Sequence, residues 1–152
     1  MHIVEVTHAR GALCAGILAT LPKWFGIAES NVAYIRAVES LPTFAAMEDG
    51  RTIGFLALER RTPFASEIHV MGVRPECHRH GAGRALVDAA ATHARAEGAR
   101  FLTVKTLSAR DPDPGYARTR AFYEAIGFCA IEEFPELWSP ENPAVLMLKV
   151  LA

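Results

Sequence analysis

The chain has 152 residues, of which 51% are hydrophobic and 22% are charged, and its formal net charge is −1. This length and composition fit a single globular domain over residues 1–152 and exclude a disordered or fibrous chain. The balanced charge argues against a general nucleic-acid or membrane binder. The longest apolar stretch, residues 11–21, is too short to span a bilayer.

The cysteines indicate a reducing environment. Cys14, Cys77 and Cys129 are an odd number and stand far apart, which is not the pattern of a disulfide framework. We therefore expect a cytoplasmic protein. Cys77 has histidines nearby, but zinc sites usually need a second ligand cluster, and the sequence has none with the usual spacing. We expect no metal.

The first part of the chain alternates strand and helix patterns. The predicted elements are, in order, a strand at 2–7, helices at 10–21 and 29–41, and strands at 43–47 and 52–59. Ser30 or Asn31 would cap the second helix. Asp49 and Gly50 predict a tight hairpin between the two strands, because such a turn needs positive φ at both central residues.

The second part continues the same alternation. The predicted elements are a strand at 66–73, a helix at 81–97, a strand at 101–106, a helix at 116–126 and strands at 129–134 and 144–151. Residues 111–115 are expected to form a rigid loop, and residues 135–143 contain three prolines. About seven strands and four helices in mixed order predict an α/β domain with a central sheet.

The most distinctive segment, residues 73–84, joins a strand to a helix that begins near Gly81 and Gly83. A helix N-terminus presents unpaired N–H groups and a partial positive charge, and glycines let an anion approach them. The segment also carries three arginines and two histidines against one acid. This predicts a pyrophosphate site, although two glycines that only allow close packing would give the same spacing. A P-loop lysine and the third glycine of a dinucleotide fingerprint are missing.

Three segments resemble the GNAT (GCN5-related N-acetyltransferase) superfamily. Residues 78–83 resemble its Gln/Arg-x-x-Gly-x-Gly/Ala motif, with His78 in place of Gln or Arg. Residues 66–73 resemble the preceding strand, and residues 121–128 resemble a C-terminal pattern that contains Phe-Tyr and Gly-Phe. The resemblance covers about residues 43–150. It implies the GNAT fold, an α/β fold whose mixed sheet of about seven strands splays between strands 4 and 5.

The resemblance implies an acetyl-CoA-dependent N-acetyltransferase. Acetyl-CoA would be the cosubstrate, and its acetyl group would pass to an amine of a small molecule or peptide by direct attack in a ternary complex. A catalytically idle CoA-binding module that acts as a sensor or interaction domain is the alternative. We expect neither nucleic acid nor membrane as a partner and leave a homodimer open.

The resemblance also implies which residues bind the cofactor. The pantetheine arm would pair with the fourth strand at Met71 and Val73. The pyrophosphate would be bound by the loop and helix start, a set that comprises His78, Arg79, His80, Gly81, Ala82, Gly83 and Arg84. Tyr123 would face the thiol sulfur as a general acid, and its alternative role is a core aromatic beside Phe122 and Phe128.

The resemblance also implies that Glu67 is the catalytic base, and a partly apolar pocket would raise its pKa. His69 is the second candidate and solvent the third. Alternatively, Glu67 is a solvated or ion-paired residue at a strand end. The resemblance places the acceptor amine at the first two helices, their connection and the last strands. The residues nominated for this site are Trp24, Phe25, Glu29, Tyr34, His69, Tyr116 and Trp138, although either tryptophan could only cap the core.

Overall fold

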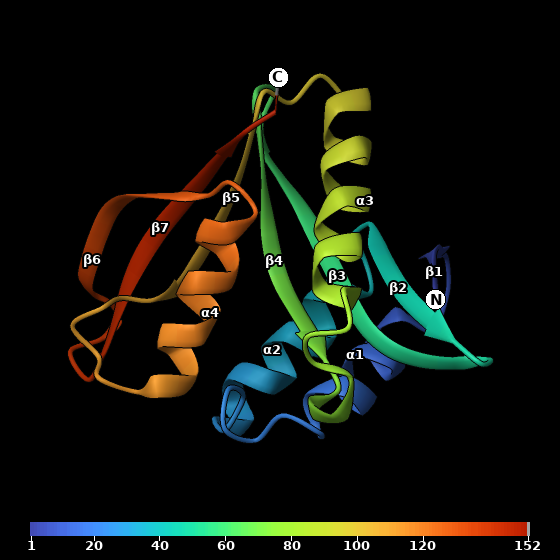
Figure 1. Cartoon of the computed structure of the whole chain (residues 1–152), viewed down its shortest axis with the longest axis horizontal. Helices are drawn as coiled ribbons and strands as arrows, with labels where there is room; N and C mark the ends of the chain where they lie inside the picture. The colour runs from blue at the N-terminus through green and yellow to red at the C-terminus, as the bar shows by residue number, and fades with distance from the viewer. Residues whose placement is uncertain (152) are drawn as a thin grey trace. The chain divides into compact units, whose positions relative to one another are not determined.

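A computed structural model describes residues 1–151 as one seven-stranded mixed sheet with four α-helices (Figure 1). The strand order is β1-β2-β3-β4-β5-β7-β6, and β4 and β5 run parallel. The elements are β1 (His2–Val6), α1 (Arg10–Leu18), α2 (Ala28–Val38), β2 (Thr43–Glu48), β3 (Arg51–Thr62), β4 (Ala65–Val73), a 3₁₀ turn (Pro75–Cys77), α3 (Ala82–Ala96), β5 (Phe101–Leu107), α4 (Pro114–Ala125), β6 (Cys129–Ser139) and β7 (Asn142–Val150). The predicted α/β class and the predicted numbers of strands and helices are confirmed.

The chain forms two compact units. The first unit comprises Met1–Glu59 and Ile68–His93, and the second comprises Arg60–Glu67 and the chain from Ala94 onward. Strands β3 and β4 and helix α3 therefore each contribute to both units. That the whole chain is a single domain stays a prediction, as does the splaying of the sheet between strands 4 and 5.

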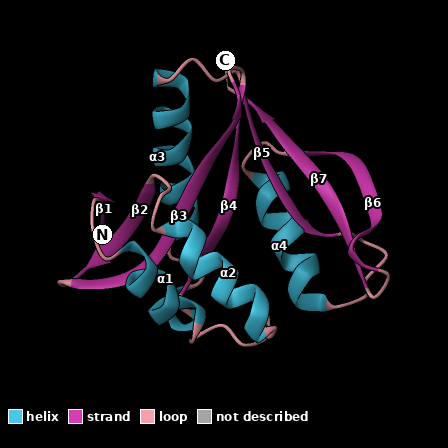
Figure 2. Ribbon diagram, turned by 180° about the vertical axis from the view of Figure 1, so that it is seen from behind, coloured by secondary structure: helices cyan, strands magenta, loops and turns pink. Residues whose placement is uncertain are grey.

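In the first unit, antiparallel strands carry helices on both faces. Helices α1 and α2 cover one face and α3 the other (Figures 1 and 2). The β2–β3 turn has φ values of 52° at Asp49 and 72° at Gly50, which confirms the predicted hairpin. The core of this unit is a cluster of buried apolar residues from α1, α2, β3 and β4 and the segments beside them, namely Cys14, Ile17, Leu18, Leu21, Val38, Phe55, Ala57 and Val70.

The predicted cap of α2 is wrong. The helix begins at Ala28, and its N-cap position is Ile27, with no side-chain cap. The Asn31 side chain instead donates from Nδ2 to the carbonyl of Phe25 at 2.8 Å. This bond ties α2 to the loop that connects it to α1, which is the loop that contains two of the predicted acceptor-site aromatics.

In the second unit, β7 pairs antiparallel with both β5 and β6, and α4 contacts β5. Helix α4 begins two residues earlier than predicted, at Pro114, because Asp113 caps it by accepting from the Gly115 amide at 3.0 Å. Strand β6 runs on to Ser139, five residues beyond the predicted end at residue 134. Pro135 is tolerated there because β6 is the edge of the sheet, where a missing N–H breaks no ladder.

Strand β4 and helix α1 pack closely at Gly72. A Cβ added there would lie 2.8 Å from Leu21 Cδ1 and 3.2 Å from Ile17 Cγ2, and both side chains belong to the buried core. Any side chain at this position would require Leu21 or Ile17 to move within the packed core.

We predict that Gly72→Ala lowers the free energy of unfolding by about 1–3 kcal/mol, because the added methyl group overpacks the core. Gly16→Ala is the matched control, since a Cβ at Gly16 in α1 meets nothing within 4 Å. That control should be neutral or stabilise by up to roughly 1 kcal/mol. Denaturant unfolding measures both, and equal stabilities for the two variants would contradict the packing argument.

Candidate functional site

The loop between β4 and α3 has the backbone shape expected of an anion site. Arg79 and Gly81 have left-handed φ values of 66° and 85°, which turn the chain sharply into the helix. The first bond of α3 runs from the Ala85 amide to the Gly81 carbonyl at 3.0 Å, so the amides before Ala85 lie outside the helical ladder. Gly81 occupies the cap position and has no side chain to cover them, and Arg79 and Arg84 are exposed beside them.

His78 is held by two contacts that the sequence does not reveal. Its Nε2 lies 2.7 Å from the carbonyl oxygen of Val73, and it must donate because a carbonyl only accepts. The ring also meets Trp24 edge-on, with centroids 5.7 Å apart. A phosphate contact by His78 would therefore have to use Nδ1. Trp24, predicted for the acceptor site, lies against the predicted phosphate loop.

A second group of side chains gathers around His69 in the first unit. His69 Nδ1 lies 3.0 Å from Glu59 Oε2, and the His69 ring meets the edge of Tyr34 at 5.8 Å. Tyr34 in turn contacts Phe25 at 5.9 Å. Three of the residues predicted for the acceptor site, Phe25, Tyr34 and His69, are thus in contact with one another through Tyr34. Burial, and secondarily the Cys14 thiol, raise the pKa of Tyr34, so its hydroxyl stays neutral.

Glu67 lies in a different environment from the one expected. Its side chain is only 7% exposed, and both oxygens are ion-paired, with Arg61 at 2.6 Å and Lys105 at 2.7 Å. Burial alone raises the pKa of Glu67, but hydrogen bonds from Lys105 and Arg61 outweigh it and hold the pKa below its ordinary value. The expectation of a raised pKa is wrong. Its role as the base stays a prediction that this arrangement does not favour.

Tyr123 is buried in α4 between two aromatic rings. Its ring meets Phe122 at 5.2 Å and Phe128 at 5.3 Å, and burial raises the pKa of its hydroxyl. Tyr123 therefore does pack beside Phe122 and Phe128, as the alternative to a general acid predicted. A proton donor role is compatible with it, since within residues 1–151 no hydrogen bond engages this hydroxyl and the side chain stays protonated at neutral pH.

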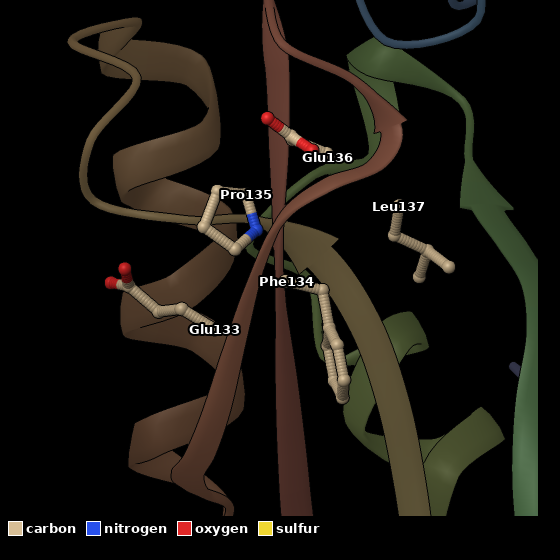
Figure 3. Close-up of a pocket in the computed structure, with 5 residues that line it drawn as sticks. All are labelled: Glu133, Phe134, Pro135, Glu136 and Leu137. Carbon is tan, nitrogen blue, oxygen red and sulfur yellow. The ribbon is translucent and has the colours of Figure 1, made fainter.

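The remaining candidates are more scattered. Met71 and Val73 are half-buried at the end of β4, Tyr116 is half-buried in α4, and Trp138 is 47% exposed on β6. A depression on β6 is lined by residues 133–137, with Glu133 and Leu137 pointing to opposite sides of the strand (Figure 3). Glu133 is ion-paired with Arg110 at 2.6 Å. This depression contains none of the predicted catalytic groups.

Sequence reasoning missed Glu59, Arg61 and Lys105. Glu59 follows six consecutive buried residues of β3, so a carboxylate there departs from the apolar pattern. The short connection between β3 and β4 also predicts that residues near 59 lie opposite residues near 69, which would have suggested the pair with His69. Lys105 gives no such signal, because it lies 38 residues from Glu67 in the chain.

Comparisons with known proteins identify relatives by family and by fold. A model of the acetyltransferase (GNAT) family matches residues 19–128. No curated protein matches the chain. One similar solved structure is a GNAT-family protein from Desulfovibrio desulfuricans, with a TM-score of 0.84, 20% identity and coverage of 99% of this chain and 98% of that one.

Two other similar solved structures are of N-acetyltransferases that are named for different acceptors. An aminoglycoside 6′-N-acetyltransferase complexed with coenzyme A has a TM-score of 0.78 and 17% identity, with coverage of 100% of this chain and 98% of that one. The ribosomal-protein-S18-alanine N-acetyltransferase from Escherichia coli has a TM-score of 0.74 and 16% identity, with coverage of 99% and 94%. At these identities the likeness concerns the fold. No helix within residues 1–151 is long and apolar enough to cross a membrane.

We predict that Glu67→Gln lowers the free energy of unfolding by about 1–3 kcal/mol at pH 7, because two cations lose their carboxylate. The folded-state pKa of Glu67 is depressed, so its contribution is full above the unfolded value of about 4.3 and is lost as the pH falls through the folded value. The difference from the wild type should shrink below about pH 4.

Urea unfolding at several pH values measures how the stability difference between Glu67→Gln and the wild type depends on pH. Glu132→Gln, on the exposed edge strand, is the control. A Glu67→Gln deficit that is independent of pH would contradict the ion-pair account.

Proposed function

The chain belongs to the GNAT family of acetyltransferases, and from this premise we propose that it transfers the acetyl group of acetyl-CoA to an amine of a small molecule or peptide. The observation that carries the amine assignment is the His69–Glu59 pair beside Tyr34. Attack by an amine releases a proton, and an imidazole is the side chain best suited to accept it near neutral pH. The similar structures, which act on an aminoglycoside and on a protein alanine, agree with an amine acceptor.

The cofactor assignment rests on the start of α3. The uncapped amides around Gly81 to Arg84 and the exposed arginines suit the pyrophosphate of acetyl-CoA. A similar structure holds coenzyme A, which supports the same class of cosubstrate. His78 would contribute mainly by fixing the conformation of the loop, because its Nε2 already donates a hydrogen bond to the Val73 carbonyl.

The chain's thiols favour direct transfer over an acetylated enzyme. Cys14 and Cys77 are buried, and burial raises the pKa of Cys14 to about 12, so it does not form a thiolate at neutral pH. Cys129 is exposed at the start of the edge strand β6, outside the predicted site. We therefore infer a ternary complex in which the amine attacks the thioester itself.

In this step the amine nitrogen forms a bond to the thioester carbonyl carbon, and the carbon–sulfur bond breaks. The proton lost by the amine passes to Nε2 of His69, and the electron pair of the broken bond leaves with the CoA sulfur. Glu67 is less suited to take the proton, because both of its oxygens already accept from cations.

Tyr123 would stabilise the leaving sulfur by hydrogen bonding. Because its pKa is raised above that of a free thiol, full proton transfer from Tyr123 to the thiolate would be unfavourable. A hydrogen bond from the hydroxyl still stabilises the negative charge as it develops. We thus assign Tyr123 the role of a donor that keeps its proton.

Acetyl-CoA should bind and raise the melting temperature, with a gain of about 2.7 kcal/mol at one hundred times Kd. Gly83→Asp should remove this gain, because it places a carboxylate beside the pyrophosphate. Gly83→Ala is the matched control and should keep it, since the family motif accepts alanine there. Differential scanning fluorimetry with acetyl-CoA measures all three proteins. A folded Gly83→Asp variant with a wild-type shift would refute the phosphate assignment.

Transfer itself is tested by thiol release with a panel of amines that contains an aminoglycoside, a polyamine and a peptide with a free N-terminus. Tyr123→Phe should lower kcat roughly tenfold to a hundredfold on an accepted amine, because it removes one hydrogen-bond donor and little packing. The acetyl-CoA thermal shift serves as its binding control and should be unchanged. A wild-type kcat in Tyr123→Phe would show that this residue only packs in the core. If the wild-type protein releases no thiol with any amine, the result counts against the proposed activity.

A further inference from the structure

We propose that Arg120 is a positioning residue for Tyr123. It fixes helix α4 against the end of β5 and thereby sets where the Tyr123 hydroxyl meets the leaving sulfur of acetyl-CoA. This inference rests on the proposed function and deepens it. Arg120 lies just before the segment 121–128 that resembles the family, and no motif singles it out. Arg120, Tyr123 and β5 all belong to the second unit.

The guanidinium group of Arg120 reaches from α4 to the end of β5. Its Nη1 donates to the carbonyl oxygen of Leu107 at 2.7 Å and to that of Ser108 at 3.0 Å. Leu107 is the last residue of β5, and Ser108 begins the loop that leads to α4. A terminal guanidinium nitrogen carries two hydrogens, so Nη1 can satisfy both carbonyls at once. One side chain therefore ties the strand to the middle of the helix that follows it.

Water cannot easily replace these two bonds. Leu107 and Ser108 are both buried, and Arg120 is half-buried. Hydrogen bonds from a charged donor are stronger than those between neutral groups, and a buried carbonyl that loses its donor is destabilising. The acceptor side is itself fixed, because the Ser108 amide donates to the carbonyl of Pro143 in β7 at 2.8 Å. Arg120 thus joins α4 to a well-anchored part of the sheet.

The aromatic neighbours of Tyr123 hold its ring to the helix. Phe122 belongs to α4, and Phe128 follows shortly after the end of α4, where its amide donates to the Tyr123 carbonyl at 3.0 Å. These contacts move with the helix, so they do not by themselves set its place on β5. Arg120 precedes Tyr123 by three residues, a spacing that puts two side chains on neighbouring positions of one helix face. A shift of the helix at Arg120 is therefore passed on to Tyr123.

A second cation holds the far end of the helix. Lys149 of β7 donates from Nζ to the carbonyl of Ile126, three residues beyond Tyr123. A helix that is held at one point can still rotate about it. The contact of Lys149 therefore does not replace that of Arg120, and Tyr123 keeps a defined place because it lies between the two.

The hydrogen bond that Tyr123 would give to the leaving sulfur depends on its position. Hydrogen bonds weaken steeply when they are lengthened or misaligned, and a misplacement of about 1 Å can lower a rate roughly a hundredfold. Arg120 does not touch acetyl-CoA or the amine in this scheme and acts only through Tyr123. Its loss should lower kcat and leave acetyl-CoA binding unchanged, because the predicted phosphate loop belongs to the first unit.

The first experiment reads the surroundings of Tyr123 without requiring turnover. The chain has three tyrosines, so labelling with 3-fluorotyrosine gives a simple ¹⁹F NMR spectrum, and Tyr123→Phe identifies the signal of Tyr123. Arg120→Met keeps a long side chain and removes every donor, so this signal should shift or broaden. Arg118→Met, at an exposed position of α4, is the matched control and should leave the signal unchanged. An unchanged Tyr123 signal in Arg120→Met would overturn the inference even if the enzyme acetylates amines.

The second experiment is a double-mutant cycle on kcat with an amine that the wild type accepts. Arg120→Met should lower kcat roughly tenfold and leave the acetyl-CoA thermal shift unchanged. It should have no further effect in the Tyr123→Phe background, because the hydroxyl that it positions is gone. A merely structural Arg120 would lower kcat by the same factor in both backgrounds, and that result contradicts the inference.

The conservative variant Arg120→Lys keeps a cationic donor on a shorter side chain. It should retain more of the wild-type kcat than Arg120→Met, since an ammonium group can still bind one of the two carbonyls. If Arg120→Met does not fold, Arg120→Lys takes its place in the NMR experiment and in the cycle. A wild-type Tyr123 signal or additive kcat effects in Arg120→Lys would then overturn the inference.

The possible results separate the two proposals. If Tyr123→Phe lowers kcat but Arg120→Met does not, the inference about Arg120 fails and the proposed function stands. If neither variant lowers kcat, Tyr123 is not the donor, and the inference fails with that assignment while the transfer reaction stands. If the wild type transfers acetyl to no amine, the proposed function fails, and the ¹⁹F result alone decides whether Arg120 positions Tyr123.

Discussion

The close approach of β4 to α1 at Gly72 is the constraint on which the candidate site of the first unit depends. Strand β4 carries His69, Met71 and Val73 and then leads directly into the loop before α3. Because Gly72 allows the strand to seat against Ile17 and Leu21, the positions of these residues are set by a tightly packed core. The proposed base His69 and the predicted anion loop therefore follow one another along the chain, and their spacing depends on this one strand.

Two carboxylates near the same strand illustrate how environment decides chemistry. Glu67 is buried between two cations, so it is fully charged, already hydrogen-bonded and poorly suited to accept a proton. Glu59 is half-buried and lies beside an imidazole, with its Oε2 3.0 Å from His69 Nδ1. The same residue type is therefore held between two cations at one position and lies beside an imidazole at the other.

The sequence predicted best what is determined locally. The Asp49-Gly50 turn and the glycine start of α3 depend on a few neighbouring φ angles, and both occur as predicted. The environment of Glu67 depends on Lys105 in β5, and the 3₁₀ turn and helix α3 separate the two residues in the chain, so no local pattern could reveal it. Likewise, the extension of β6 through Pro135 depends on that strand being at the edge, which is a property of the whole sheet.

The edge position of β6 has a consequence for how the protein behaves at high concentration. An exposed edge offers unpaired N–H and C=O groups on which a strand of another molecule can align. Pro135 removes one of these donors in the middle of the strand, and the glutamates at 132, 133 and 136 would bring like charges together in any self-aligned pair. The exposed Ile131 and Leu137 can thus remain on this strand without making it a template for fibril growth.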